Sequence, residues 1–201
     1  MNKKDRLPLM LLIVFTIFWL FIAIIAYDRL VWFSENLLSM LFVPLLVLTY
    51  HKFRFSNVTY FLLFFFMILH TIGSYYTYTN MPVFNWVQTM FGLSRNYYDR
   101  VVHFLFGLIF YFPVYELITK KLKIRGWTSY LLPLLIIISF KAIYEILEYL
   151  AVIVTHNLAF SDSFLGMQGD QWDAQKDIMS GITGAVISMV IHRLWVSRLQ
   201  K

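Results

Sequence analysis

LPLMLLIVFTIFWLFIAIIAY, residues 7–27, is a long apolar run that contains no charged side chain. A bilayer core is about 30 Å thick, and an α-helix needs about 20 apolar residues to cross it. The run is therefore long enough for one membrane-spanning helix. Basic residues precede it, as in a signal peptide. However, it is too long for one and no Ala-x-Ala cleavage site follows, so we expect a retained helix.

The composition of the whole chain agrees with a membrane location. Hydrophobic residues make up 60% of the 201 residues and charged residues 14%, against about 45–50% and about 25% in soluble domains. A soluble core of this size cannot cover so much apolar surface. The absence of cysteine excludes disulfides and cysteine nucleophiles. The net charge of +6 does not indicate nucleic-acid binding, because in a membrane protein the position of the charges carries the information.

Five further segments are apolar enough to span the membrane. The sequence thus predicts an all-α, polytopic membrane protein, with one domain over residues 1–201 built as a bundle of six transmembrane helices. Pro113 and Pro133 are expected to kink two of these helices. Residues 79–96 have a spacing that predicts a short interfacial helix. The predicted spans are 7–27, 34–50, 58–76, 98–118, 130–155 and 172–195.

The positions of the basic residues predict the orientation. Twelve of the 17 Lys and Arg residues lie in segments that alternate to one side of the membrane, including both termini. The positive-inside rule places that side in the cytoplasm. We therefore expect a multi-pass plasma-membrane protein in contact with lipids, with cytoplasmic termini and an outward-facing 156–171 loop.

Small residues on the last predicted helix share one face. Three of them are spaced four residues apart and two more lie directly beside these, a pattern that favours close packing against another helix. The residues are Ser180, Gly181, Gly184, Ala185 and Ser188.

Ionisable side chains recur near the outer ends of four spans. Each costs about 2.5–3.5 kcal/mol at the centre of a span, so such residues usually face the bundle interior and mark function. Three pairs are spaced three or four residues apart and so share a helical face. We expect one outward-opening pocket formed by His70, Asp99, Arg100, His103, Lys141, Glu145, Glu148, Asp173, Lys176 and Asp177.

This mixture of imidazoles and carboxylates suits a divalent metal ion such as Zn, Mn or Fe. One alternative is a proton or ion relay in which Lys141, Arg100 and Lys176 neutralise the carboxylates directly. Another is a network that only holds the helices together. Glu35 and His156 are open as further members. The predicted metal ligands are His70, Asp99, His103, Glu148, Asp173 and Asp177.

The predicted function is a metal-dependent membrane hydrolase or transferase that acts on a lipid or lipid-linked head group. A metal-held water would attack a phosphoryl or acyl centre, with Glu145 or Glu148 as base. Lys141 or Arg100 would stabilise the negative charge that develops. No Ser-His-Asp order, phosphate-binding loop or nicotinamide fingerprint is present. The alternatives are a non-enzymatic ion-binding or transport protein and an accessory membrane subunit.

The segment before the last span is rich in glycine and polar residues. Gly166 and Gly169 permit tight turns, and Asp170 can cap the last helix. Gln168 adds hydrogen-bonding groups nearby, so the segment is typical of a lid over a site.

Three motifs carry a family resemblance. YDRVVH (98–103), YEILE (144–148) and GDQWDAQKD (169–177) resemble the motifs of the YjdF-like family of bacterial inner-membrane proteins. The resemblance implies a small multi-pass bacterial membrane protein and no particular reaction. More distantly, the order of an Asp-x-x-x-His helix, a Glu-bearing helix and an Asp-bearing helix resembles the VanZ-like family, which is linked to glycopeptide tolerance. That pattern usually has an Arg before its last Asp motif, where this sequence has Lys176 nearby.

Overall fold

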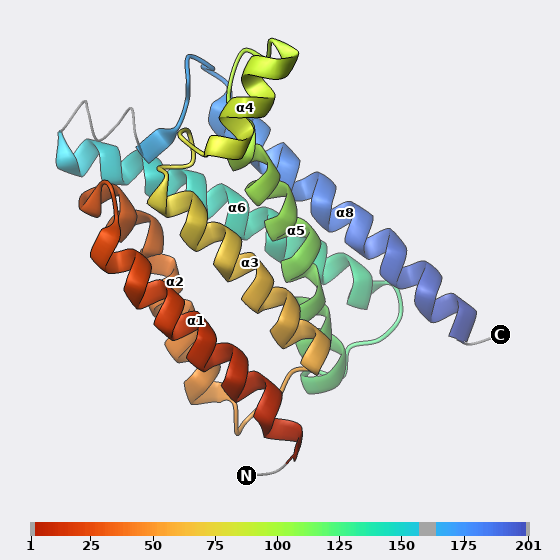
Figure 1. The fold of residues 1–201 in the computed structure, drawn as a ribbon. Helices are drawn as coiled ribbons and strands as arrows, with labels where there is room; N and C mark the ends of the chain where they lie inside the picture. Colours follow the sequence, from red (N-terminus) through yellow and green to blue (C-terminus); the bar gives the residue numbers. More distant parts are fainter. Residues whose placement is uncertain (1–2, 157–163, 200–201) are drawn as a thin grey trace. The chain divides into compact units, whose positions relative to one another are not determined.

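The computed structural model describes residues 3–156 and 164–199, and the long elements of this part of the chain are all helices (Figure 1). The predicted all-α class is therefore confirmed. The helices are η1 (Lys3–Asp5), α1 (Arg6–Ile25), α2 (Arg29–Thr49), α3 (Asn57–Tyr75), α4 (Pro82–Phe91), α5 (Tyr98–Glu116), η2 (Leu117–Lys121), α6 (Thr128–Thr155) and α8 (Asp173–Leu199).

Within residues 3–156 and 164–199, five helical segments are long and apolar enough to cross a membrane: α1, α2, α3, α5 together with η2, and α6. Helix α8 is also long enough, but it is the least apolar of the long helices. The reason is that Asp173, Lys176 and Asp177 occupy its first turns and His192 and Arg193 lie further along. The sixth span therefore stays a prediction.

The helix bounds lie close to the predicted spans except at the start of α2. This helix begins at Arg29 and not at residue 34. Asp28 is its N-cap, because one carboxylate oxygen accepts hydrogen bonds from the backbone N–H groups of Leu30 and Val31, both at 3.0 Å.

The prolines of the long helices lie inside continuous helical segments. Pro113 lies near the end of α5, and the chain then continues as the π-helix η2. The short helix predicted within residues 79–96 is α4, which begins at Pro82 and ends before Gly92. Gly92 has a φ of 60°, the left-handed conformation typical of a helix C-terminus.

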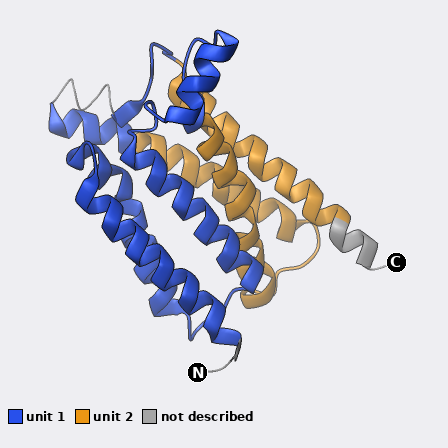
Figure 2. Cartoon of the chain, in the orientation of Figure 1, with its two compact units in different colours: residues 1–99, 147–171 blue, residues 100–146, 172–201 orange. Residues whose placement is uncertain are grey.

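The chain divides into two compact units (Figure 2). Unit 1 consists of residues 1–99 and 147–171, and unit 2 consists of residues 100–146 and 172–201. The chain passes from one unit to the other within α5 and within α6. The single domain predicted from the sequence stays a prediction.

In unit 1, helix α3 packs against α1 and α2 (Figure 1). A buried amide joins the three helices. The side-chain oxygen of Asn36 accepts a hydrogen bond from Nε1 of Trp19 at 2.7 Å, and its nitrogen donates to Oγ of Ser74 at 3.0 Å. Such polar contacts between helices compensate for the weak hydrophobic drive inside a membrane.

In unit 2, helices α5 and α8 cross with their backbones in contact. A Cβ atom added to Gly107 would lie 1.8 Å from the carbonyl oxygen of Gly181, and one added to Gly184 would lie 2.1 Å from that of Phe104. The close packing predicted for the small-residue face is therefore confirmed. This crossing fixes the first turns of α8 against the first turns of α5.

Candidate functional site

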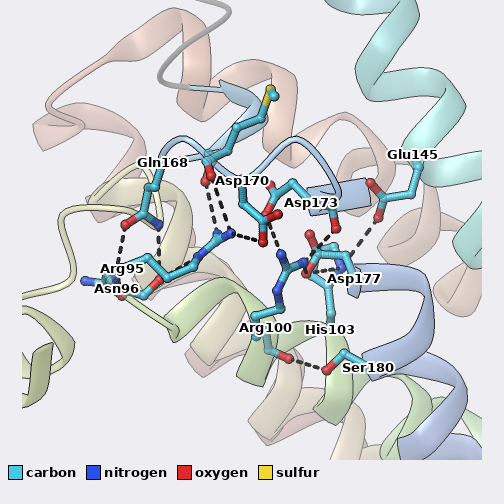
Figure 3. Close-up of polar contacts among 12 residues, drawn as sticks. Arg95, Asn96, Arg100, His103, Glu145, Gln168, Asp170, Asp173, Asp177 and Ser180 are labelled. Carbon is cyan, nitrogen blue, oxygen red and sulfur yellow. Dashed lines mark hydrogen bonds and ion pairs between the residues drawn. The ribbon is translucent and has the colours of Figure 1, made fainter. Parts of the chain in front are cut away.

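Five buried ionisable side chains of unit 2 and the partly buried Arg100 form one group, which we call the unit 2 cluster; Figure 3 labels each of them except Lys141. Their side chains range from 3% exposed at Asp177 to 11% exposed at Arg100. Three helices supply them. The members are Arg100 and His103 of α5, Lys141 and Glu145 of α6, and Asp173 and Asp177 of α8.

Arg100 joins the first two turns of α8 to α5. Its guanidinium nitrogens lie 2.5 Å from a carboxylate oxygen of Asp173 and 2.5 Å from one of Asp177. Ser180 fixes the same region, because its hydroxyl donates to the backbone oxygen of Arg100 at 2.8 Å. The four-residue spacing of the two aspartates places both on the helix face that meets the guanidinium.

Lys141 and His103 form the other half of the cluster. Nζ of Lys141 lies 2.7 Å from Nδ1 of His103 and 3.0 Å from Oε1 of Glu145. Gly181 makes room for the lysine, since a Cβ there would lie 2.9 Å from its Cγ. With Lys141 as an ammonium, Nδ1 of His103 accepts the hydrogen bond, so the neutral imidazole carries its proton on Nε2.

Two carboxylates also lie near the same imidazole nitrogen. Nδ1 of His103 is 3.4 Å from Asp177 and 3.5 Å from Glu145. The cluster therefore contains three carboxylates against the two positive charges of Arg100 and Lys141. With a neutral imidazole its formal charge is negative by one unit. Buried negative charge is costly, so this composition favours one more positive charge, either a proton or a cation.

His70 lies in unit 1, where both of its ring nitrogens form hydrogen bonds. Nε2 lies 3.2 Å from the backbone oxygen of Glu35, and Nδ1 lies 2.5 Å from the hydroxyl of Tyr78. A carbonyl oxygen can only accept, so Nε2 carries the hydrogen and Nδ1 accepts from the tyrosine. His70 as a metal ligand stays a prediction, and it requires one of these hydrogen bonds to break.

Three carboxylates of unit 1 lie near Tyr78. Burial raises the pKa of Tyr78 well above 10, and the nearby charges of Glu35, Asp99 and Glu148 raise it further. Gly73 makes room for the tyrosine ring, because a Cβ there would lie 2.7 Å from a ring carbon. We call Glu35, His70, Tyr78, Asp99 and Glu148 the Tyr78 group. His156, the other open candidate, is exposed.

Residues 166–168 of the predicted lid segment form hydrogen bonds with residues 95 and 96, also of unit 1 (Figure 3). Arg95, only 4% exposed, donates to the backbone oxygens of Gly166 at 3.1 Å and Met167 at 3.4 Å. The side chain of Gln168 accepts from the backbone N–H of Asn96 at 2.8 Å and donates to its carbonyl at 3.1 Å.

Two glycines and an aspartate complete this lid segment. Gly166 and Gly169 have φ angles of 61° and 84°, as expected for tight turns. Asp170, predicted as a helix cap, lies 3.8 Å from a guanidinium nitrogen of Arg95. No motif or spacing in the sequence indicated a role for Arg95. The neighbouring Asn96 did carry a signal, because asparagine is common just before a helix. Its side chain accepts a hydrogen bond from the backbone N–H of Tyr98 at 2.9 Å, at the start of α5.

The residues predicted to form one pocket are found in both units, and a single pocket that contains all of them stays a prediction. Lys176 is exposed at the surface of α8. Asp99, in the Tyr78 group, precedes Arg100 directly and lies one helical turn before His103 on the same face of α5. The unit 2 cluster holds Arg100, His103, Lys141, Glu145, Asp173 and Asp177, and the Tyr78 group holds His70, Asp99 and Glu148.

Apolar helices of spanning length, with ionisable side chains buried among them, define an integral multi-pass membrane protein. The chain belongs to the family described as "Predicted membrane protein (DUF2238)", which matches residues 7–198. It is 33% identical over 176 residues to a protein of Escherichia coli (strain K12) named "Inner membrane protein YjdF", covering 87% of this chain and 83% of that relative. No solved structure matches. The predicted YjdF-like membership is confirmed.

Proposed function

We propose that the unit 2 cluster is the functional site and that it binds a divalent metal ion such as Zn, Mn or Fe. The observation that carries this proposal is the charge of the cluster, whose six described members are three buried carboxylates, an imidazole, Arg100 and Lys141. Imidazole and carboxylate together are ligands that these ions accept. The proposed ligands are His103, Asp173 and Asp177, which all lie in unit 2.

Lys141 has a defined place in this proposal. Its ammonium lies between His103 and Glu145, at 2.7 Å and 3.0 Å, where it is the cation that these groups hold without a metal. A lysine side chain has a flexible stem, so the ammonium can turn away when a metal ion enters. Lys141 is then available to stabilise the negative charge of a bound substrate.

The chemistry that follows is hydrolysis or group transfer at a lipid or lipid-linked head group. A divalent ion supplies a nucleophilic water at neutral pH. Glu145 is the proposed base, because its carboxylate lies 3.5 Å from the imidazole and shares the buried site. Arg100 stabilises a phosphoryl or acyl oxygen that gains charge. The location of the cluster within apolar helices favours a substrate that is itself anchored in the membrane.

A second candidate function is a non-enzymatic proton or ion carrier. The 2.7 Å contact between Lys141 and His103 favours it, because a lysine and an imidazole at that distance share one hydrogen between two basic nitrogens. In this case the additional positive charge of the cluster is a proton. A purely structural network in an accessory subunit is the remaining alternative.

Elemental analysis of the purified full-length protein separates these candidates. We expect about one transition-metal ion per chain in the parent and much less in Asp177→Asn, which keeps the shape of the side chain but removes its charge. Asp170→Asn is the matched control, because Asp170 pairs with Arg95 in unit 1. If the parent protein stays metal-free after reconstitution with Zn, Mn and Fe, the metal site is refuted and the carrier and the structural network are left.

A further inference from the structure

Unit 1 contains a cavity of about 420 Å³ that only unit 1 residues line. This volume lies within the range of about 300–1,000 Å³ typical of ligand pockets. Helices α1, α2 and α3 form its walls. Its lining is apolar except at one end, where Asp5, Tyr50, His51 and Tyr60 lie.

The cavity follows the direction of the membrane-spanning helices. Its lining residues on α1 run from Pro8 to Phe15, which at 1.5 Å per residue is about 10 Å. Half of a bilayer core measures about 15 Å. The cavity therefore begins near the end of three apolar helices and extends into one leaflet, at the depth of lipid acyl chains.

Hydrogen bonds connect the residues at the polar end of the cavity. The hydroxyl of Tyr50 donates to Asp5 at 2.5 Å and accepts from Nε of Arg54 at 3.1 Å. Another nitrogen of Arg54 donates to the backbone oxygen of Lys4 at 2.5 Å. These contacts hold the start of α1 against the loop between α2 and α3, so the two basic segments lie at the same end of unit 1.

The charges around this rim are unbalanced. Lys4, Arg6 and Lys52 are exposed there and Arg54 is half-buried, against the single carboxylate of Asp5. Basic residues beside the end of a transmembrane helix attract anionic lipids. A rim with an excess of positive charge above an apolar cavity is complementary to a molecule with an anionic head and an apolar tail.

We propose that this cavity holds one acyl chain of an anionic glycerophospholipid, with the head group against Lys4, Arg6 and Lys52. The site is separate from the unit 2 cluster and does not depend on any activity of that cluster.

Native mass spectrometry of the full-length protein, titrated with dioleoyl phosphatidylglycerol or dioleoyl phosphatidylcholine, tests this proposal. The two lipids have the same acyl chains and differ in head-group charge. We expect the parent to bind one phosphatidylglycerol about tenfold more tightly than phosphatidylcholine. Equal affinities for the two lipids would overturn the proposal.

Two substitutions on the same helix test the cavity itself. Leu46 lines the cavity, whereas Leu45 lies outside the lining and is 57% exposed. We expect Leu46→Trp to fill the cavity and weaken phosphatidylglycerol binding about tenfold or more, while Leu45→Trp binds like the parent. Equal binding by both variants, or a dimer that occupies the cavity and excludes lipid, would contradict the proposal.

A second variant keeps the test decisive if Leu46→Trp does not fold. Lys4→Gln combined with Lys52→Gln changes only exposed side chains at the rim. We expect this double variant to lose most of the preference for phosphatidylglycerol. Lys121→Gln, an exposed lysine of η2, is the control and should keep that preference. An unchanged preference in the double variant would refute head-group recognition at this rim.

Discussion

Nζ of Lys141 lies 2.7 Å from Nδ1 of His103, and both side chains are buried in unit 2. The lysine projects from α6 and the histidine from α5, and Glu145 accepts from the same ammonium at 3.0 Å. This ammonium therefore links the imidazole to a carboxylate in the centre of the unit 2 cluster. Its removal is the most informative single change in the protein.

Lys141→Met retains most of the apolar stem and removes the charge. Without metal, the variant leaves Glu145 without its ammonium, and loss of one partner of a buried pair costs about 3–5 kcal/mol. A divalent metal ion should restore the lost stability, since it replaces the missing positive charge. Thermal unfolding with chelator and with added Zn or Mn measures both effects.

Lys120→Met is the control for this experiment. Lys120 pairs with Glu116 at 3.4 Å, but its side chain is 56% exposed, so we expect little loss of stability. If Lys141→Met unfolds at the same temperature with chelator and with metal, the cluster does not bind the ions tested.

Gly107→Ala tests the crossing of α5 and α8. The new Cβ would lie 1.8 Å from the carbonyl oxygen of Gly181, so the helices must separate. We expect a loss of about 1–3 kcal/mol or more in the free energy of unfolding. Thr183→Leu adds a larger group to the exposed side of α8 and should leave stability nearly unchanged. Equal stability of the two variants would argue against a close crossing.

Tyr78→Phe tests the hydrogen bond to His70 and the burial of the hydroxyl. Below pH 10 the variant should lose about 1 kcal/mol, the usual value of one hydrogen bond. Burial raises the pKa of Tyr78 in the folded state, so above pH 10 the unfolded chain releases a proton that the folded chain keeps. The parent therefore loses stability relative to the variant as the pH rises above 10.

Denaturant unfolding at pH 8 and pH 10.5 measures this difference. Tyr27→Phe, at a side chain that is 86% exposed, serves as the control. A stability difference between the parent and Tyr78→Phe that does not change with pH would show that the hydroxyl is not buried.

The orientation can be tested because the chain has no cysteine. Asn80→Cys lies in the exposed turn before α4, and Arg125→Cys lies in the basic segment between η2 and α6. The positive-inside rule predicts that a membrane-impermeant thiol reagent labels only the first in intact cells. Labelling of Arg125→Cys alone, or of both from outside, would contradict the predicted orientation.

Helical spacing made much of the unit 2 cluster predictable. Asp173 and Asp177 are four residues apart, and so are Lys141 and Glu145, so each pair had to share a helix face. The cost of ionisable groups in apolar helices indicated that these faces point inward. All six members of the cluster were among the residues predicted for the pocket, and local sequence was sufficient because each pair lies on one regular helix.

The partners of His70 and Arg95 could not be predicted from the sequence. The partners of His70 are the backbone of Glu35 and the side chain of Tyr78. Tyr78 lies within a turn in which it and Thr77 have φ angles of 54° and 50°. Left-handed backbone at such residues is uncommon and has no sequence signal here. Burial of Arg95 likewise depends on carbonyls of Gly166 and Met167, which are distant in the sequence.

Calorimetric titration of Zn or Mn into the metal-free full-length protein is the most direct test that the unit 2 cluster binds a divalent ion. Asp177 is a proposed ligand in the cluster, whereas Glu116, near the end of α5, pairs with Lys120 at 3.4 Å. We predict one binding site per chain in the parent, a large loss of affinity in Asp177→Asn, and binding close to that of the parent in Glu116→Gln. No binding by the parent, or equal affinities for the two variants, would contradict a metal site at this cluster.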